Sequence, residues 1–270
     1  MIPIGDNLRS RSFPYVNVAI ITVNVLIFLY LLTLSTVPLR PLGLSELDRF
    51  VYTWGAIPAC LGDQFGFHPS APTRDLAAVC GVNSEVGAVF YSMFIHGGWL
   101  HLLGNMVFLW VFGDNVEDAM GHARYAVFYL TVGLGATAAQ VWANQNDLTP
   151  AIGASGAIAG VLGAYLVLYP RATVTAILPF FLLFWIPFHV PAVFLIGIWF
   201  ALQLFNGIAA LTSTDVVNAG GGVAWFAHIG GFVAGIVLVR LFVLGRTVRP
   251  ARRRSAGGAS VVSGSKPESA

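Results

Sequence analysis

Long stretches without a charged side chain set the pattern of this chain of 270 residues. No Asp, Glu, Lys or Arg occurs in the windows 12–39, 86–113, 125–146, 148–170, 172–214 and 216–239. Each window is long enough for the roughly 20 apolar residues that cross a bilayer as a helix. None shows the alternation of apolar and polar residues that a membrane β-barrel strand requires. Because a segment in lipid must satisfy its own backbone hydrogen bonds, the pattern predicts a bundle of membrane-spanning helices.

The charges outside these windows predict the number of spans and their direction. Arg9 and Arg11 precede the first window, and a basic stretch from Arg246 to Lys266 follows the last. Positively charged flanks stay on the cytoplasmic side, so both ends are expected there and the number of spans is even. Six spans fit if residues 190–210 form the fifth. The preceding segment, which contains several Pro residues, then lies on or dips into the cytoplasmic face over residues 172–189.

These spans divide the chain into three expected parts. Residues 1–13 are a cytoplasmic N-terminus, residues 14–245 a membrane domain, and residues 246–270 a basic and then disordered cytoplasmic tail. The first window has a longer apolar core than a signal peptide and no small-residue cleavage site. It is therefore interpreted as a permanent span.

The long external loop, about residues 36–86, contains two features of interest. Apolar residues are spaced there as on one face of an amphipathic helix: Leu47, Phe50, Val51 and Trp54. Cys60 and Cys80 also fall in this loop, where an oxidising compartment would allow a disulfide. Their spacing is equally compatible with two free thiols, or with Cys60 buried at the membrane interface.

Composition supports the membrane interpretation and excludes other classes. Hydrophobic residues make up 57% of the chain and charged residues only 10%, whereas a soluble domain has about 25% charged residues. The supply of charge is too small for a soluble enzyme surface or for a disordered chain. Two Cys are too few for a disulfide-dense secreted scaffold. The expected fold class is an all-α polytopic membrane protein with a six-helix bundle.

Uncharged polar side chains inside the spans are candidates for function, because they are costly in hydrocarbon. His101 and Asn105 lie on the second span at a spacing that puts both on one helix face. Ser155 begins the fourth span, and His228 lies near the start of the sixth. Taken singly, each is compatible with ordinary helix packing. In the six-span topology, however, these spans run in the same direction, so all four residues meet near the external face.

This combination of residues suits nucleophilic catalysis. A Ser hydroxyl needs a base, and neutral imidazole is one at pH 7. Two small-x-x-x-small patterns allow the fourth and sixth helices to pack closely: Gly156 to Gly160 and Gly231 to Gly235. No Asp or Glu is available in the spans, so the sequence predicts a dyad of Ser155 and His228.

The same residues offer donors for an oxyanion. The side chains of His101 and Asn105 each carry an N–H, and the backbone N–H of Ser155 lies near a helix N-terminus. Gly153 permits a close approach of the backbone at this turn.

The chain resembles the rhomboid intramembrane serine proteases of bacterial type. The similar stretches occur in the order of that family: His96-Gly-Gly-Trp-Leu-His101-Leu-Leu-Gly-Asn105, Gly153-Ala-Ser155-Gly156 and Ala227-His228-Ile-Gly-Gly231. The resemblance implies that Ser155 is the nucleophile, His228 the base, and His101 and Asn105 part of the oxyanion site. It implies a structural or accessory role for His96.

The resemblance also implies a setting and partners. A multi-pass protein of a bacterial plasma membrane is expected, with its site open to the external face. It would cleave transmembrane segments of other proteins within the lipid bilayer, without metal, cofactor or nucleic acid. The sequence departs from the family pattern at two places. Gly87-Ala88 replaces a Trp-Arg pair that many members carry, and Ala159 replaces an aromatic that stacks on the base in some members, so packing is expected to hold His228.

Two other functions compete with proteolysis. A non-catalytic protein of the same fold would bind client transmembrane helices, but such relatives usually lack the Ser or the His, and this chain has both. A small transporter or channel would need polar residues across the whole bilayer. Here the inner halves of the fourth and sixth spans are apolar.

Overall fold

The computed structural model describes residues 1–37, 43–64, 66, 79–82, 86–180, 184–212 and 223–248. In chain order the elements are β1 (Ile2–Asp6), α1 (Tyr15–Leu31), α2 (Glu46–Trp54), α3 (Pro58–Gln64), α5 (Val86–Tyr91), η1 (Ser92–Phe94), α6 (Trp99–Met120), α7 (His122–Ala143), α8 (Ser155–Leu168), β2 (Thr173–Phe180), β3 (Phe184–Pro191), α9 (Ala192–Thr212) and α10 (Trp225–Phe242). The chain is therefore mostly helical, as the sequence predicts. The predicted tail beyond residue 248 lies outside the described residues.

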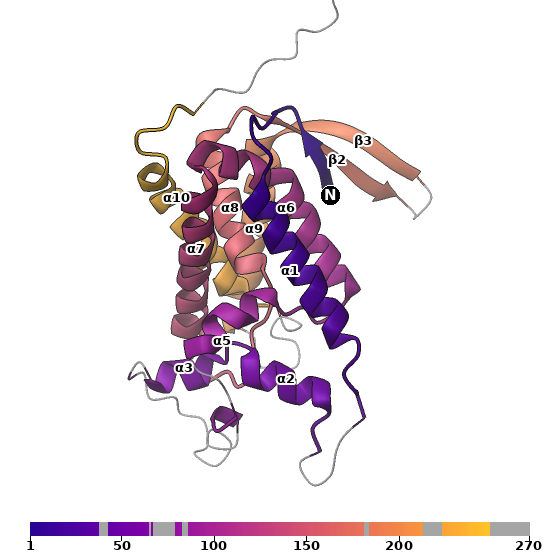
Figure 1. Cartoon of the computed structure of the whole chain (residues 1–270), viewed down its shortest axis with the longest axis vertical. Helices are drawn as coiled ribbons and strands as arrows, with labels where there is room; N and C mark the ends of the chain where they lie inside the picture. The colour runs from indigo at the N-terminus through magenta and orange to yellow at the C-terminus, as the bar shows by residue number, and fades with distance from the viewer. Residues whose placement is uncertain are drawn as a thin grey trace, which may run out of the picture.

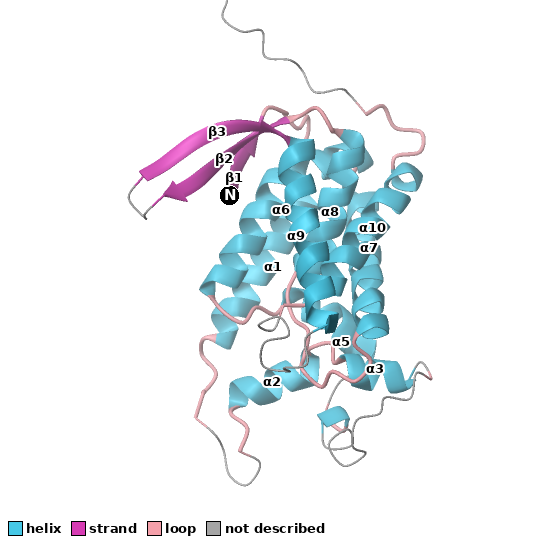
Figure 2. Cartoon of the chain, turned by 180° about the vertical axis from the view of Figure 1, so that it is seen from behind, coloured by secondary structure: helices cyan, strands magenta, loops and turns pink. Residues whose placement is uncertain are grey.

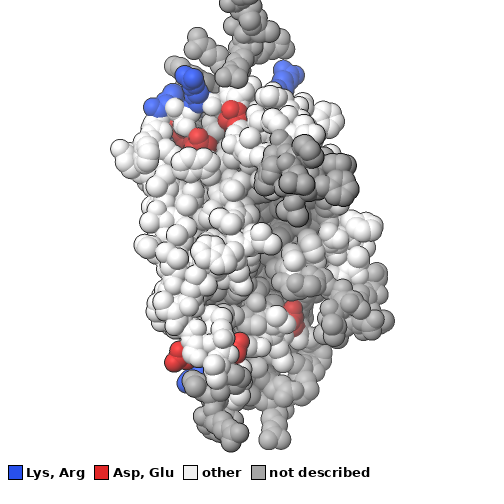
Figure 3. Space-filling view, turned by 90° about the vertical axis from the view of Figure 1, so that its right-hand side faces the viewer, with Lys and Arg blue, Asp and Glu red and all other residues white. Residues whose placement is uncertain are grey.

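The long helices α1, α6, α7, α8, α9 and α10 stand side by side (Figures 1 and 2). By length and composition, α7, α9 and α10 can each cross a membrane, and α6 passes the same test only together with α5 and η1, from which it is bent by 92°. Helices α1 and α8 are shorter apolar helices. Each charge-free window overlaps one helix of this bundle. On the face shown in Figure 3, charged residues gather toward the two ends and leave an uncharged belt between them.

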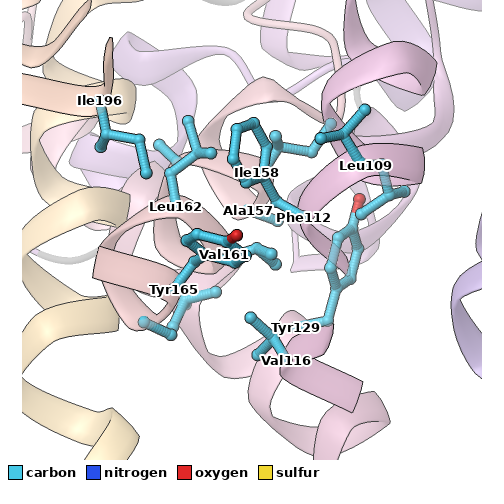
Figure 4. Packing of buried hydrophobic residues seen from close by; sticks show 14 of the residues in the cluster. Leu109, Phe112, Val116, Tyr129, Ala157, Ile158, Val161, Leu162, Tyr165 and Ile196 are labelled. Carbon is cyan, nitrogen blue, oxygen red and sulfur yellow. The ribbon is translucent and has the colours of Figure 1, made fainter. Parts of the chain in front are cut away.

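Helix α8 is the centre of the bundle. Every residue from Gly156 to Tyr165 is buried, and α6, α7, α9 and α10 all pack against it. Figure 4 shows its residues Ile158 and Leu162 among side chains of the neighbouring helices, Phe112 from α6 and Ile196 from α9. A helix that is apolar on every side needs this complete burial, and the position of α8 places its first residue between several other helices.

The segment 172–189 differs from the expected apolar excursion, because most of it forms a β-hairpin. Strand β2 pairs with β3 and with β1, both antiparallel, in the order β1-β2-β3. The register places Ile2 opposite Ile177, so Pro179 lies beyond the end of β1, where its missing N–H costs no ladder bond. The sheet lies at the end of the bundle where the N-terminus is, and its hairpin projects sideways (Figure 1). The fold is thus not purely α-helical.

The second span also differs in its limits. Residues from 86 form the short helices α5 and η1, and α6 begins only at Trp99. Helix α6 then continues to Met120, past the expected end at residue 113 and through three carboxylates. These carboxylates have partners in the N-terminal segment. Glu117 accepts hydrogen bonds from the backbone N–H groups at the start of α1, and Arg11 forms an ion pair with Asp118.

At the opposite end, the loop predicted to be external contains one predicted feature and settles an open question. The amphipathic helix forms as α2, and Ser45 and Asp48 cap its N-terminus reciprocally. Cys60 and Cys80 form a disulfide, which decides between the alternatives left open by their spacing. The loop contacts the bundle through a bridge between Ala56 and Ala151, the latter just before α8. Residues 38–42, 65, 67–78 and 83–85 of the expected loop lie outside the described residues.

Candidate active site

Ser155 is the first residue of α8, and the turn before it brings the chain close to α6. Gly153 has φ +120°, a conformation that side chains rarely adopt, and a Cβ there would lie 2.6 Å from His101 Nε2. The Gly153 N–H donates to the Ser92 carbonyl at 2.8 Å, which holds the turn. The close approach predicted for Gly153 is therefore present. As a first-turn residue, Ser155 has a backbone N–H with no acceptor one turn earlier in its helix.

Ser155 and His228 are in contact. The distance between Ser155 Oγ and His228 Nε2 is 2.7 Å, a hydrogen bond that joins α8 to α10. The backbones of these helices touch, because a Cβ on Gly231 would collide with the Gly156 carbonyl. A Cβ on Gly235 would collide with Gly160 in the same way. The two predicted small-residue patterns thus meet each other and set the distance between the hydroxyl and the imidazole.

The other nitrogen of His228 has a partner that the sequence analysis missed. His228 Nδ1 lies 2.8 Å from Gln203 Oε1 on α9. The prediction that packing holds His228 is therefore incomplete, because a hydrogen bond orients the ring as well. The signal was present, since Gln203 is a polar residue inside a charge-free window. Its partner depends on the register between α9 and α10, which no motif encodes.

Aromatic rings flank His228 although Ala159 provides none. The ring of Trp199 on α9 lies 5.9 Å from the imidazole between centroids, tilted by 38°. Trp225 approaches edge-on at 6.2 Å from α10. Two indole rings from helices other than α8 therefore contact His228, although Ala159 supplies no aromatic ring.

His101 and Asn105 lie beside the turn that precedes Ser155. A Cβ added to Gly153 would lie 3.7 Å from Asn105 Nδ2 and 2.6 Å from His101 Nε2. Asn105 Nδ2 is also 2.9 Å from His96 Nε2, and the rings of His96 and His101 are 4.9 Å apart. His96 is buried and contacts the Asn105 amide. This contact is compatible with the accessory role expected for His96. The departure at Gly87-Ala88 falls in α5, where Ala88 is completely buried.

A cavity opens beside Ser155 on the side of α7. Small residues line much of it, among them Gly153, Gly156 and Ala136. Gln140 also lines this cavity, and its Oε1 accepts a hydrogen bond from the Ala227 N–H at 3.1 Å. The cavity offers space next to the Ser155 hydroxyl for a small side chain or water. Within the described residues, no group of three or more His, Cys, Asp or Glu is placed to hold a metal ion.

Comparison with known proteins identifies relatives that share this region. Residues 83–245 match the Rhomboid domain family. Rhomboid protein 1, mitochondrial, of Saccharomyces cerevisiae is 29% identical over 160 residues, covering 58% of this chain and 41% of that protein. RHOMBOID-like protein 1 of Arabidopsis thaliana is 25% identical over 237 residues, covering 86% and 54%. Rhomboid-like protease 5 of Toxoplasma gondii is 30% identical over 157 residues, covering 57% and 16%.

These relatives limit what the similarity implies. The chain spans about half of their length or less, from 54% down to 16%. They come from a yeast, a plant and a protozoan, so they do not support the bacterial type that the motifs suggested.

Proposed function

We propose that this chain, which belongs to the rhomboid family, is an intramembrane serine endopeptidase that cleaves transmembrane segments of other proteins. The observation that supports this most strongly is the 2.7 Å hydrogen bond between Ser155 Oγ and His228 Nε2. It joins a candidate nucleophile and a candidate base inside a bundle of apolar helices, where polar side chains are costly and therefore mark a functional site.

In the proposed reaction, the Ser155 hydroxyl donates its proton to His228 Nε2 as Oγ attacks the substrate carbonyl. The negative charge that develops on the carbonyl oxygen needs hydrogen-bond donors. His101 Nε2, Asn105 Nδ2 and the Ser155 backbone N–H are the available donors around the turn at Gly153. His228 then passes the proton to the leaving amine. A water molecule attacks the acyl-enzyme in the second half of the reaction, again with His228 as base.

The bundle suggests how a substrate reaches this pair. A substrate helix would approach from the lipid beside α9, and its backbone must unwind locally, because a helical carbonyl is already hydrogen-bonded. Water would enter from the end of the bundle that α2 and α3 cover. In the predicted six-span topology this end is external and both termini are cytoplasmic. A bacterial plasma membrane remains our prediction for the compartment.

Cleavage of a reporter protein with one transmembrane segment, reconstituted with the purified chain in vesicles, tests the proposal. Wild type should cleave the reporter, and a fluorophosphonate probe should label Ser155. Ser155→Ala should fold normally, lose the label and reduce cleavage by at least about 10⁴-fold. Ser45→Ala, which removes a buried hydroxyl in the cap of α2, is the control and should cleave like wild type.

Cleavage by Ser155→Ala at the wild-type rate would overturn the proposal. A wild-type protein that binds the reporter helix without cleaving it or reacting with the probe would instead favour a non-catalytic protein that binds client helices. Solute flux through vesicles containing the chain would favour a transporter or channel.

A further inference from the structure

We infer that Gln203 is a positioning residue for the base: its side-chain oxygen fixes His228 in the tautomer that carries the proton on Nδ1. The inference rests on the proposed proteolytic function, and it replaces the expected dyad by an arrangement of Ser155, His228 and a neutral amide. The contact that carries it is the 2.8 Å distance between His228 Nδ1 and Gln203 Oε1.

The tautomer follows from what each atom can donate or accept. A neutral imidazole has one N–H and one bare nitrogen. Gln203 Oε1 can only accept, so the hydrogen bond places the proton on Nδ1. Nε2 is then bare and can accept the Ser155 hydroxyl at 2.7 Å. The opposite tautomer would present an N–H to the hydroxyl and could not remove its proton.

The orientation of the Gln203 amide is itself held in place. Its Nε2 donates to the Trp199 carbonyl at 3.2 Å, one turn earlier on α9. A flipped amide would lose this bond and would point an NH₂ group at His228, which selects the wrong tautomer. Both ends of the amide therefore have partners, as a buried polar group requires.

Packing between α9 and α10 keeps the two side chains at this distance. The ring of Phe200 stacks on Phe232 with centroids 4.2 Å apart and an angle of 20°. Phe232 lies one turn after His228, and Phe200 lies one turn before Gln203, so the stack fixes the register of the two helices. Helix α9 thus supplies part of the catalytic geometry, although α8 and α10 carry the reacting groups.

A neutral acceptor also suits the location. A carboxylate in the apolar interior would cost free energy that an amide does not. Gln203 therefore orients the imidazole without placing a charge among the helices. Its contribution is to the geometry and protonation pattern of the base, and we expect it to be visible in kcat rather than in KM.

The test compares Gln203→Met with Gln203→Glu. Met has a similar size but no acceptor, and Glu restores an acceptor oxygen at the same place. With the reporter in vesicles, Gln203→Met should lower kcat about 10- to 100-fold with KM unchanged, because Nδ1–H loses its partner. Gln203→Glu should recover most of kcat and move the acidic limb of the pH–rate profile to higher pH. Val127→Ala, at an exposed site of α7 rather than of the helix beside which the substrate would approach, is the control and should match wild type.

A spectroscopic measurement makes the inference independent of turnover. In protein labelled with ¹⁵N-His, the resonances that vanish in His228→Ala should show a protonated Nδ1 and a bare Nε2. Gln203→Met should mix the two tautomers. Equal kcat and an unchanged ¹⁵N spectrum in Gln203→Met would overturn the inference while leaving the proposed function intact. A wild type that neither cleaves nor reacts with the probe would overturn the function, and the spectra would still decide whether Gln203 sets the tautomer.

Discussion

Helices α6 and α8 each carry polar residues at both ends, and the two ends differ in kind. At one end lies the Ser155 cluster, which comprises Ser155, His228, Gln203, His101, Asn105 and His96. At the other end lies the Glu117 cluster, which comprises Glu117, Asp6, Asp114, Asn115 and Tyr165. The first contains no carboxylate, whereas three of the five members of the second are carboxylates. Both clusters are largely buried, so burial alone does not distinguish a candidate site from a structural one.

The partners of the two clusters show the difference in role. Glu117 accepts from the N–H groups of Val16 and Asn17 at 3.0 and 2.7 Å, which satisfies the first turn of α1. Asp6 accepts from Tyr165 on α8 and from Asn115 on α6. Glu117 and Asp6 thus connect the N-terminal segment to the bundle, because each carboxylate accepts two hydrogen bonds between these two parts. In the Ser155 cluster, donors of the side chains and backbone face the turn before Ser155. The Glu117 cluster therefore stabilises the fold, whereas the proposed function gives the Ser155 cluster a chemical role.

The largest expected effect comes from Gly231→Val, because Gly231 lies where α8 and α10 touch and both roles meet. Its Cβ would collide with the Gly156 carbonyl, a backbone atom that cannot move aside. Overpacking costs about 1–3 kcal/mol where side chains can adjust, so we expect a larger loss here. Separation of Ser155 from His228 should lower cleavage by more than about 100-fold. Denaturant unfolding in micelles and reporter cleavage measure the two effects.

Gly197→Ala is the matched control for that variant. Gly197 also lies in a helix, but a Cβ there would contact nothing within 4 Å. It should leave cleavage unchanged and stabilise the fold slightly. Wild-type activity in Gly231→Val would show that close contact of α8 and α10 is unnecessary for the Ser155–His228 pair.

Glu117→Leu should affect stability alone. It leaves two N–H groups of α1 without acceptors, and His122 loses its contact with the Glu117 carboxylate. Each buried N–H group left without an acceptor costs about 1–3 kcal/mol. The free energy of unfolding should fall accordingly, while kcat of the folded fraction, determined by active-site titration with the probe, stays at the wild-type value. A lower kcat per labelled site would mean that the two clusters are coupled. Glu117→Gln, which keeps one acceptor, should lose less stability.

Asn105→Leu, unlike Glu117→Leu, should lower kcat. Removal of one oxyanion donor costs about 10²–10³ in kcat, and the loss of the hydrogen bond to buried His96 should cost about 1–3 kcal/mol of stability as well. Asn115→Leu is the matched control, because Asn115 is an equally buried amide on the same helix that donates to Asp6 and Asp114. It should lower stability and spare kcat. Equal losses of kcat in both variants would remove the distinction between the clusters.

The sequence alone predicts much of the Ser155 cluster and little of the Glu117 cluster. The charge-free windows and the small-residue spacing predict that Ser155 lies near His228. Both signals are local and depend only on helix geometry. The contact of Gln203 with His228 is not predicted by the sequence, because it depends on the register of α9 against α10. The sequence pattern predicts that the second span ends before the carboxylates of α6. Their partners at the N-terminus lie about a hundred positions away in the chain, and no local pattern shows them.

The hairpin β2–β3 and the disulfide show two further limits. A short apolar run with Pro residues is compatible with a strand or with an interrupted helix, and pairing with β1 decides the matter here. The spacing of Cys60 and Cys80 carries no information on whether they bond, because spacing alone does not determine cysteine pairing. In both cases the missing information is a contact between distant segments.

The smallest effect is a pH dependence of stability that arises in the Glu117 cluster. Burial raises the pKa of the Asp6 carboxyl from 3.8 to about 6, although hydrogen bonds from Tyr165, Leu8 and Asn115 oppose the shift. Because the folded state binds this proton more tightly than the unfolded chain, ionisation of Asp6 opposes folding. The contribution of Asp6 to stability is therefore greatest below about pH 4. It falls as pH rises to about 6 and is constant above that value.

Asp6→Asn should remove this dependence. A shift of about two pKa units corresponds to at most about 3 kcal/mol, and the amide loses one of the three acceptor contacts, which offsets about 1 kcal/mol of the gain at neutral pH. The variant should thus be less stable than wild type near pH 4 and about 2 kcal/mol more stable near pH 7, as measured by denaturant unfolding at both pH values. Its kcat at pH 7 should equal that of wild type, because the Ser155 cluster lies at the other end of α8. A wild-type pH profile of stability in Asp6→Asn would show that another group governs it. A change in kcat would show that α8 transmits the state of one cluster to the other.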